Sequence, residues 1–259
     1  MTRRAAARLG AGSTQSMAKP SPPGSSRGLT QRLRSAEGRS TASQKWLNRQ
    51  LNDPYVRAAK ERGLRSRAAF KLLEMQEKVK LLKPGARVVD LGAAPGGWTQ
   101  VAVEAVGPRG QVVALDILPM DPVPGATILQ GDFQEEEAEA RIIACMGGKA
   151  DLVLSDMAPN TTGHAATDHL RIMALAELAL DFALKVLAPG GSFVAKVFQG
   201  GSEKDMLVTL KRHFATVRHV KPPASRKESA ELYVVASGFR GRAFSSQVDT
   251  LGGSENAIK

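Results

Sequence analysis

Short apolar runs alternate with longer amphipathic segments through the middle of the chain. The short runs are rich in Val, Ile and Leu and predict strands. They lie at Arg87–Leu91, Gln111–Ile117, Thr127–Gln130, Ala150–Ser155, Ser192–Phe198, Val217–Lys221 and Leu232–Ser237. The longer segments predict helices at Ser43–Leu51, Ser66–Lys80, Gly97–Val106, Asp168–Leu187 and Glu203–His213, with a further amphipathic helix that ends near Cys145. Strands separated by helices predict an α/β fold with a seven-stranded, mostly parallel sheet and helices on both faces.

The length and composition of the chain fit a single domain. With 259 residues, of which 42% are hydrophobic, the chain can bury a sizeable core. We expect one domain over residues 41–242, with a helical N-terminal part at 41–82 and a core at 83–242. No apolar run is long enough for a membrane span. The single cysteine, Cys145, excludes an intramolecular disulfide, and four scattered His give no ligand spacing, so we expect a reducing compartment and no metal site.

Positive charge is concentrated near the beginning of the sequence. Residues 1–50 contain ten Lys and Arg and one acid, Glu37, and so contribute +9 of the formal net charge of +11. Residues 1–40 are rich in Ser, Gly and Pro and have no apolar period, which predicts a disordered basic arm; residues 243–259 predict a loose polar tail. The arm suits a polyanion such as nucleic acid, although a solvated tail or a mitochondrial transit peptide would have a similar composition.

A glycine-rich turn, Asp90-Leu91-Gly92-Ala93-Ala94-Pro95-Gly96-Gly97-Trp98-Thr99, follows the first predicted strand and opens a helix. Glycine lets the backbone turn tightly and approach a ligand, and the free N–H groups at the helix start favour an anionic group such as a carboxylate. Ala94 stands where a dinucleotide fingerprint needs glycine, and the Gly-Lys-Ser/Thr of a P-loop is absent. The pattern points away from NAD and ATP, while an ordinary strand–helix turn stays open as an interpretation.

Two acidic residues follow the next two predicted strands. Asp116 lies about 20 residues after the turn, where an acidic side chain can accept hydrogen bonds from ribose hydroxyls. Asp132 follows the third strand and is expected to bind an adenine amino group. Either acid alone would be interpreted as a surface or capping residue. Together with the glycine-rich turn, they predict a nucleoside site at the carboxyl ends of the strands.

Several segments together carry a pattern that is more specific than any one of them. They are Trp46-Leu47-x-Arg49-Gln50-x-x-Asp53-Pro54-Tyr55, Ser66–Leu72, Asp90–Trp98, Ser155–Pro159, Phe193–Phe198 and Ser225–Tyr233. In these segments the chain resembles the FtsJ-type (RrmJ/RlmE) 2′-O-ribose methyltransferases. The resemblance extends over about residues 40–242 and leaves out the basic arm.

The resemblance implies a Rossmann-like methyltransferase fold that uses S-adenosyl-L-methionine. It assigns cofactor contacts to Gly96, Trp98, Asp116, Asp132 and Asp156. It also implies a catalytic tetrad, which falls on Lys71, Asp156, Lys196 and Glu231. Bacterial members of the family methylate a uridine ribose of 23S rRNA in the assembled large ribosomal subunit, so the resemblance implies that substrate.

Lys196 is the most unusual of these four residues when it is judged by its own surroundings. It lies between Ala195 and Val197 in an apolar strand, where an unpaired ammonium is costly unless it extends to solvent at the strand end. A desolvated lysine beside a second cation, here Lys71, has a lowered pKa. Lys196 could then accept the proton of the ribose 2′-hydroxyl as its oxygen attacks the methyl group.

The other members of the tetrad have supporting roles in this scheme. Asp156 follows the fourth strand and can orient Lys196 near the positive sulfonium, although a turn residue before Ala158-Pro159 would look the same. We expect Glu231 and Lys71 to set the charge balance and hold the ribose; without the family pattern both would pass as surface charges. Displacement from a sulfonium needs no metal, because the cofactor brings the electrophile.

RNA must reach this site, and five cations precede Lys71 in the sequence: Arg57, Lys60, Arg62, Arg65 and Arg67. We expect them to hold phosphates without reading sequence, unless they form an ordinary solvated helix face. The expected protein is a monomeric enzyme of the bacterial cytoplasm, with the mitochondrial matrix as the alternative compartment. A tRNA or mRNA cap methyltransferase and a non-catalytic rRNA-binding assembly factor stay open as alternative functions.

Overall fold

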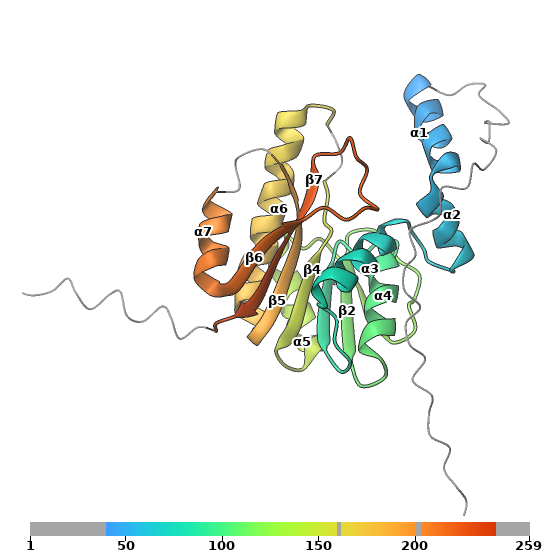
Figure 1. Cartoon of the computed structure of the whole chain (residues 1–259). Helices are drawn as coiled ribbons and strands as arrows, with labels where there is room; N and C mark the ends of the chain where they lie inside the picture. The colour runs from blue at the N-terminus through green and yellow to red at the C-terminus, as the bar shows by residue number, and fades with distance from the viewer. Residues whose placement is uncertain (1–39, 160–161, 200–203, 242–259) are drawn as a thin grey trace, which may run out of the picture.

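The structure is a computed structural model that describes residues 40–159, 162–199 and 204–241. Its strands form one sheet in the order β3-β2-β1-β4-β5-β7-β6 (Figure 1). The strands are β1 (Arg87–Leu91), β2 (Gln111–Asp116), β3 (Ala126–Gln130), β4 (Ala150–Ser155), β5 (Leu187–Phe198), β6 (Phe214–Val220) and β7 (Glu231–Phe239). Neighbours from β3 to β5 are parallel, and β7 is antiparallel to both β5 and β6. The predicted seven-stranded, mostly parallel sheet is therefore confirmed.

Helices cover both faces of this sheet. They are α1 (Thr41–Asn52), α2 (Pro54–Glu61), α3 (Ala68–Val79), α4 (Gly97–Val106), α5 (Glu136–Met146), α6 (Ala165–Val186) and α7 (Lys204–His213). Val88 packs in the core beneath α3 and α4, whereas its neighbour Val89 packs beneath α5 and α6, as the two-residue period of a strand requires. Helices α1 and α2 extend away from the sheet beyond α3 (Figure 1).

Besides shifts of up to three residues at the ends of other elements, two elements differ from the predictions. Helix α2 was not predicted as a separate helix: Asp53 caps it by accepting a hydrogen bond from the Tyr55 N–H at 2.9 Å, and Pro54 occupies its first turn. Strand β5 begins at Leu187, not Ser192, because Leu187 already pairs with Ala150 before a register shift leads into the regular ladder. Pro189 and Gly190 are typical of a turn after a helix, so the sequence did not predict strand pairing at Leu187.

The strand order reverses between β1 and β4, and the carboxyl ends of these strands are where ligands bind in open α/β sheets. Leu91 of β1 pairs with Ser155 of β4, so Asp156 emerges at this reversal, and its N–H donates to the Leu91 carbonyl at 3.0 Å. On the other side, Lys196 of β5 is directly opposite Tyr233 of β7. Opposite residues of an antiparallel pair share a face, which here is the face covered by α3.

Some expectations fall outside this part of the chain. The basic arm, up to residue 39, and the tail after residue 241 lie outside the described residues. Among the described residues, no helix combines the length and apolar character needed to cross a membrane. The same residues contain no group of three His, Cys, Asp or Glu side chains arranged to hold a metal ion.

Candidate active site

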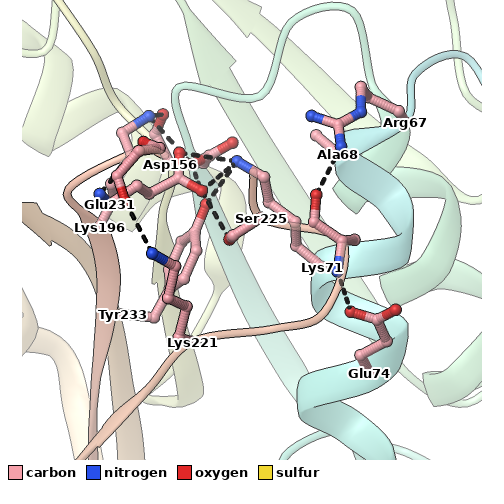
Figure 2. A network of polar contacts seen from close by, with 12 residues as sticks. Arg67, Ala68, Lys71, Glu74, Asp156, Lys196, Lys221, Ser225, Glu231 and Tyr233 are labelled. Atoms are coloured by element: carbon pink, nitrogen blue, oxygen red, sulfur yellow. Dashed lines mark hydrogen bonds and ion pairs between the residues drawn. The ribbon is translucent and has the colours of Figure 1, made fainter. Parts of the chain in front are cut away.

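Two ion pairs meet where β4, β5 and β7 face helix α3 (Figure 2). Lys196 donates from Nζ to the Asp156 carbonyl oxygen at 2.6 Å and to its Oδ1 at 3.0 Å. Lys71 of α3 pairs with the Glu231 carboxylate, at 2.7 Å from Oε1 and 2.8 Å from Oε2. Both lysines are only 8% exposed. The structure thus brings together all four residues of the expected tetrad, each ammonium with its own carboxylate.

Tyr233 joins the two ion pairs. Its hydroxyl donates to Asp156 Oδ1 at 2.7 Å and accepts from Lys71 Nζ at 3.1 Å. Burial, together with the charges of Asp156 and Glu231, raises the pKa of Tyr233 well above its usual range, so the phenol remains a donor at neutral pH. The role of Tyr233 could not be predicted from the sequence, because its position opposite Lys196 depends on the register of β5 and β7.

Asp156 is held as a carboxylate despite its burial. Burial by itself would raise its pKa, but the charges of Lys196 and Lys71 and the hydrogen bonds from Tyr233 and Lys196 lower the pKa below its ordinary value. Lys71 was expected to act directly beside Lys196. In the structure it is linked to the Lys196 ion pair through the Tyr233 hydroxyl and Asp156.

The Glu231 side of the network is fastened to helices α2 and α3 by the loop between β6 and β7. Ser225 donates from its hydroxyl to Glu231 Oε1 at 2.8 Å. One residue earlier, the Ala224 N–H donates to the buried Glu74 carboxylate of α3 at 2.7 Å, and the same carboxylate accepts from the Tyr55 hydroxyl at 2.9 Å. These bonds hold the loop, and with it Glu231, in a fixed position relative to Lys71.

The glycine-rich turn lies beside this network. Gly92 has a φ of +74°, and a Cβ there would lie 2.7 Å from the backbone of Met157, so only glycine allows the turn to approach the segment after β4. Asp116 accepts from the Ala94 N–H of the turn through Oδ2 and from the Leu118 N–H through Oδ1, each at 2.8 Å. Each of these oxygens keeps a second lone pair for a ligand hydroxyl.

Two other predicted cofactor residues have local partners. Asp132 accepts from the Gln134 N–H through Oδ1 at 2.9 Å, which leaves Oδ2 for an external donor. Trp98 is buried, and its indole N–H donates to the Ala68 carbonyl at 2.8 Å while its ring packs against Tyr233. A contact between Trp98 and a cofactor would therefore come from its backbone at the start of α4.

Asp90, near the end of β1, is a further buried acid, and the sequence predicted no separate role for it. The Thr99 hydroxyl donates to its Oδ2 at 2.7 Å, whereas Oδ1 has no hydrogen-bond partner among the described residues. Burial raises the pKa of Asp90 to about 7; the carboxylates of Asp156 and Asp116 add to the rise, and the bond from Thr99 opposes it. Because Oδ1 of Asp90 is buried without a partner, a hydrogen bond from an external donor would stabilise it.

The sequence matches the family model described as FtsJ-like methyltransferase over residues 64–239, which include the turn, the ion pairs and all the strands. The chain belongs to the FtsJ-like methyltransferase family. Family membership and the sheet order together confirm the Rossmann-like methyltransferase fold.

Relatives of this FtsJ-like methyltransferase are similar over most of their length. A protein of Granulibacter bethesdensis named ribosomal RNA large subunit methyltransferase E is 65% identical over 224 residues, 86% of this chain and 96% of the relative. A protein of Gluconobacter oxydans with the same name is 67% identical over 216 residues, 83% and 79% of the two chains. A crystal structure of a ribosomal RNA methyltransferase from Plasmodium falciparum superimposes with a TM-score of 0.62 at 30% identity, over 69% of this chain and all of that one.

The five cations expected to hold RNA fall into two groups in the FtsJ-like methyltransferase. Arg57, Lys60 and Arg62 are exposed. In contrast, Arg67 forms an ion pair with Asp53 at 2.8 Å and donates to the Ala224 carbonyl at 2.6 Å. Arg65 donates to the Pro95 carbonyl of the glycine-rich turn and to two carbonyls of the loop between β2 and β3. Among the described residues, the first group makes no such bond to a carbonyl or carboxylate, although the Arg62 guanidinium lies 5.5 Å from the centroid of the Phe70 ring.

We predict that Asp90→Asn changes the pH dependence of stability. The pKa of Asp90 is about 7 in the folded protein and near 3.8 when unfolded, so the folded state binds more protons between these values, and wild-type stability falls as pH rises. The variant lacks this penalty. Relative to the variant, the free energy of unfolding of the wild type should fall by roughly 1.4 kcal/mol per pH unit in this window, measured by urea unfolding. A difference that stays constant from pH 4.5 to 8 would contradict the prediction.

Proposed function

We propose that the protein transfers a methyl group from S-adenosyl-L-methionine to the 2′-hydroxyl of a uridine ribose in 23S rRNA of the large ribosomal subunit. The observation that carries the proposal is the buried Lys196–Asp156 ion pair at the carboxyl edge of the sheet, beside the glycine-rich turn. The names of the relatives support ribosomal RNA of the large subunit as substrate. The fold family supports a methyl donor bound at the same edge.

The residues at this edge fit the methyl donor. Backbone N–H groups at the start of α4 suit its carboxylate, and the unpartnered Oδ1 of Asp90 suits a donor such as its ammonium. Asp116 would accept from the ribose hydroxyls, and Asp132 would accept from the adenine amino group. When bound, S-adenosyl-L-methionine supplies a methyl group on a positively charged sulfur, which makes that carbon electrophilic.

Lys196 is the proton acceptor in this proposal. Its ammonium has three donors, and the two contacts with Asp156 orient it from one side. In the neutral form, the lone pair of Nζ would take the proton from the ribose hydroxyl when the methyl group moves from the sulfur to that oxygen. Oδ1 of Asp156 accepts hydrogen bonds from both Lys196 and Tyr233, so the carboxylate stabilises the Lys196 ammonium less than it would with the lysine as its only partner.

Lys71 and Glu231 hold the ribose. They form the second ion pair and line a cavity between α3 and the β6–β7 loop. The volume of this cavity is about 320 Å³. Arg226 also lines this cavity, beside Glu228, and its positive charge suits a polar, negatively charged strand. The exposed cations Arg57, Lys60 and Arg62 extend the positive surface along α2 and would contact flanking phosphates. The proposed enzyme acts as a monomer in the bacterial cytoplasm.

Lys196→Ala should slow methyl transfer strongly and leave cofactor binding intact. The variant removes the proposed base, so we expect kcat to fall by about 100-fold or more. The assay is transfer of a tritiated methyl group to large subunits from a strain that lacks the enzyme, with binding of S-adenosyl-L-methionine measured in parallel.

A matched control for Lys196→Ala is Lys185→Ala, which removes a half-exposed lysine from α6 and should leave kcat unchanged. Undiminished methyl transfer by Lys196→Ala would refute the role of Lys196. If the wild type bound subunits but transferred no methyl group, an RNA-binding assembly factor would replace the enzyme as the function.

Tyr233→Phe keeps the packed ring and removes only the hydroxyl that joins the two ion pairs. Asp156 and Lys71 each lose a hydrogen bond, so we expect kcat to fall about tenfold, or roughly 1.4 kcal/mol, with little change in cofactor binding. Tyr55→Phe is the comparison, because it removes the other tyrosine hydroxyl of the chain, which reaches the ion pairs only indirectly, through Glu74 and the β6–β7 loop, so its loss of kcat should be smaller. Equal losses of kcat in both variants would show that the hydroxyl of Tyr233 has no special role.

A further inference from the structure

Arg65 lies in the short segment between α2 and α3 and reaches two loops of the sheet edge at once. From Nη1 it donates to the Pro95 carbonyl of the glycine-rich turn at 3.2 Å and to the Asp121 carbonyl at 2.7 Å. From Nη2 it donates to the Pro122 carbonyl at 2.6 Å. Asp121 and Pro122 belong to the loop between β2 and β3, which begins directly after Asp116.

Helix α4, which begins at the end of the glycine-rich turn, fixes the backbone of Arg65. Gln100 of α4 accepts from the Arg65 backbone N–H at 2.8 Å and donates from its side chain to the Gly63 carbonyl at 3.1 Å. The guanidinium therefore extends from an anchored backbone. All three bonds of the guanidinium end on backbone carbonyls and none on a side chain, so they hold the backbones of the two loops in place. The planar guanidinium of arginine suits this role because it can donate to several carbonyls at once.

Gly96 gives an independent sign of this arrangement. Its φ is +105°, and a Cβ built at this position would lie 2.8 Å from Arg65 Nη1 and 3.1 Å from the sulfur of Met120. The absent side chain of Gly96 therefore makes room for Arg65 and the β2–β3 loop. The glycine was predicted to allow close approach of a ligand, and in the structure it also allows close approach of Arg65.

We propose that Arg65 is a positioning residue of the cofactor site, which ties the glycine-rich turn after β1 to the loop after β2 and fixes the separation of these two walls. The inference rests on the proposed binding of S-adenosyl-L-methionine between the turn and Asp116. It removes Arg65 from the set of cations that contact RNA. Exposed Arg62, three residues earlier, keeps that expected role.

The test compares Arg65→Met with Arg65→Lys and with Arg62→Met. Arg65→Met removes the three donors, so the dissociation constant for S-adenosyl-L-methionine, measured by calorimetry without RNA, should rise about tenfold or more. The KM for large subunits should stay within about twofold, because the loss lies in cofactor binding and not in RNA contacts. Arg62→Met should leave cofactor binding unchanged.

Arg65→Lys separates geometry from charge. Lysine keeps the positive charge but cannot span three carbonyls as a planar fork, so its cofactor affinity should fall between those of Arg65→Met and wild type. Wild-type cofactor affinity in Arg65→Lys would overturn the proposal, as would a rise in the KM for subunits with unchanged cofactor binding. If Arg65→Met does not fold, the dissociation constant of Arg65→Lys decides by itself. Since RNA is absent from the binding measurement, its outcome is distinct from any failure of the proposed methyl transfer.

Discussion

The site depends on keeping two ammonium groups out of water at the edge of one sheet. Such burial is tolerated only when each charge is paired and hydrogen-bonded, and here Asp156 and Glu231 provide the partners while the Tyr233 hydroxyl connects the pairs. Removing one partner would leave an uncompensated charge. The register of β5 against β7, the exit of Asp156 beside β1, and the bracing of the β6–β7 loop by Glu74 all maintain this balance.

The same edge of the sheet serves both substrates of the proposed reaction. The turn after β1 approaches the segment after β4 at Gly92, so the cofactor side and the Lys196 side are separated by a single strand. Helix α3 closes the other side: Ala68 accepts from the Trp98 indole, and Lys71, one turn later, reaches the ion pairs. A rigid contact between α3 and α4 thus places the proposed ribose-binding lysine relative to the cofactor turn.

Much of this arrangement could be predicted, and most exceptions depend on contacts that only the fold creates. The seven strands and their mostly parallel direction follow from apolar periodicity, and the glycine-rich turn follows from its motif. The four tetrad residues were named from the family resemblance, and their catalytic roles stay predictions. Tyr233 could not be recognised, because its role depends on pairing with Lys196 across strands 37 residues apart in sequence. Arg65 and Arg67 were predicted among the RNA-facing cations, since sequence shows charge but not the carbonyls and carboxylate that the fold places around it. Helix α2 was missed because it has only eight residues, too few for a clear helical period, although its cap Asp53 and Pro54 are signals that the sequence contains.

The most direct measurement for the central claim is mass-spectrometric mapping of methylated nucleotides. Large subunits from a strain without the enzyme would be incubated with the purified protein and S-adenosyl-L-methionine, and the RNA compared before and after. The account predicts that one uridine of 23S rRNA gains a methyl group on its ribose 2′-oxygen. A methyl group on a base, or a gain found only when tRNA or capped mRNA replaces the subunits, would contradict it.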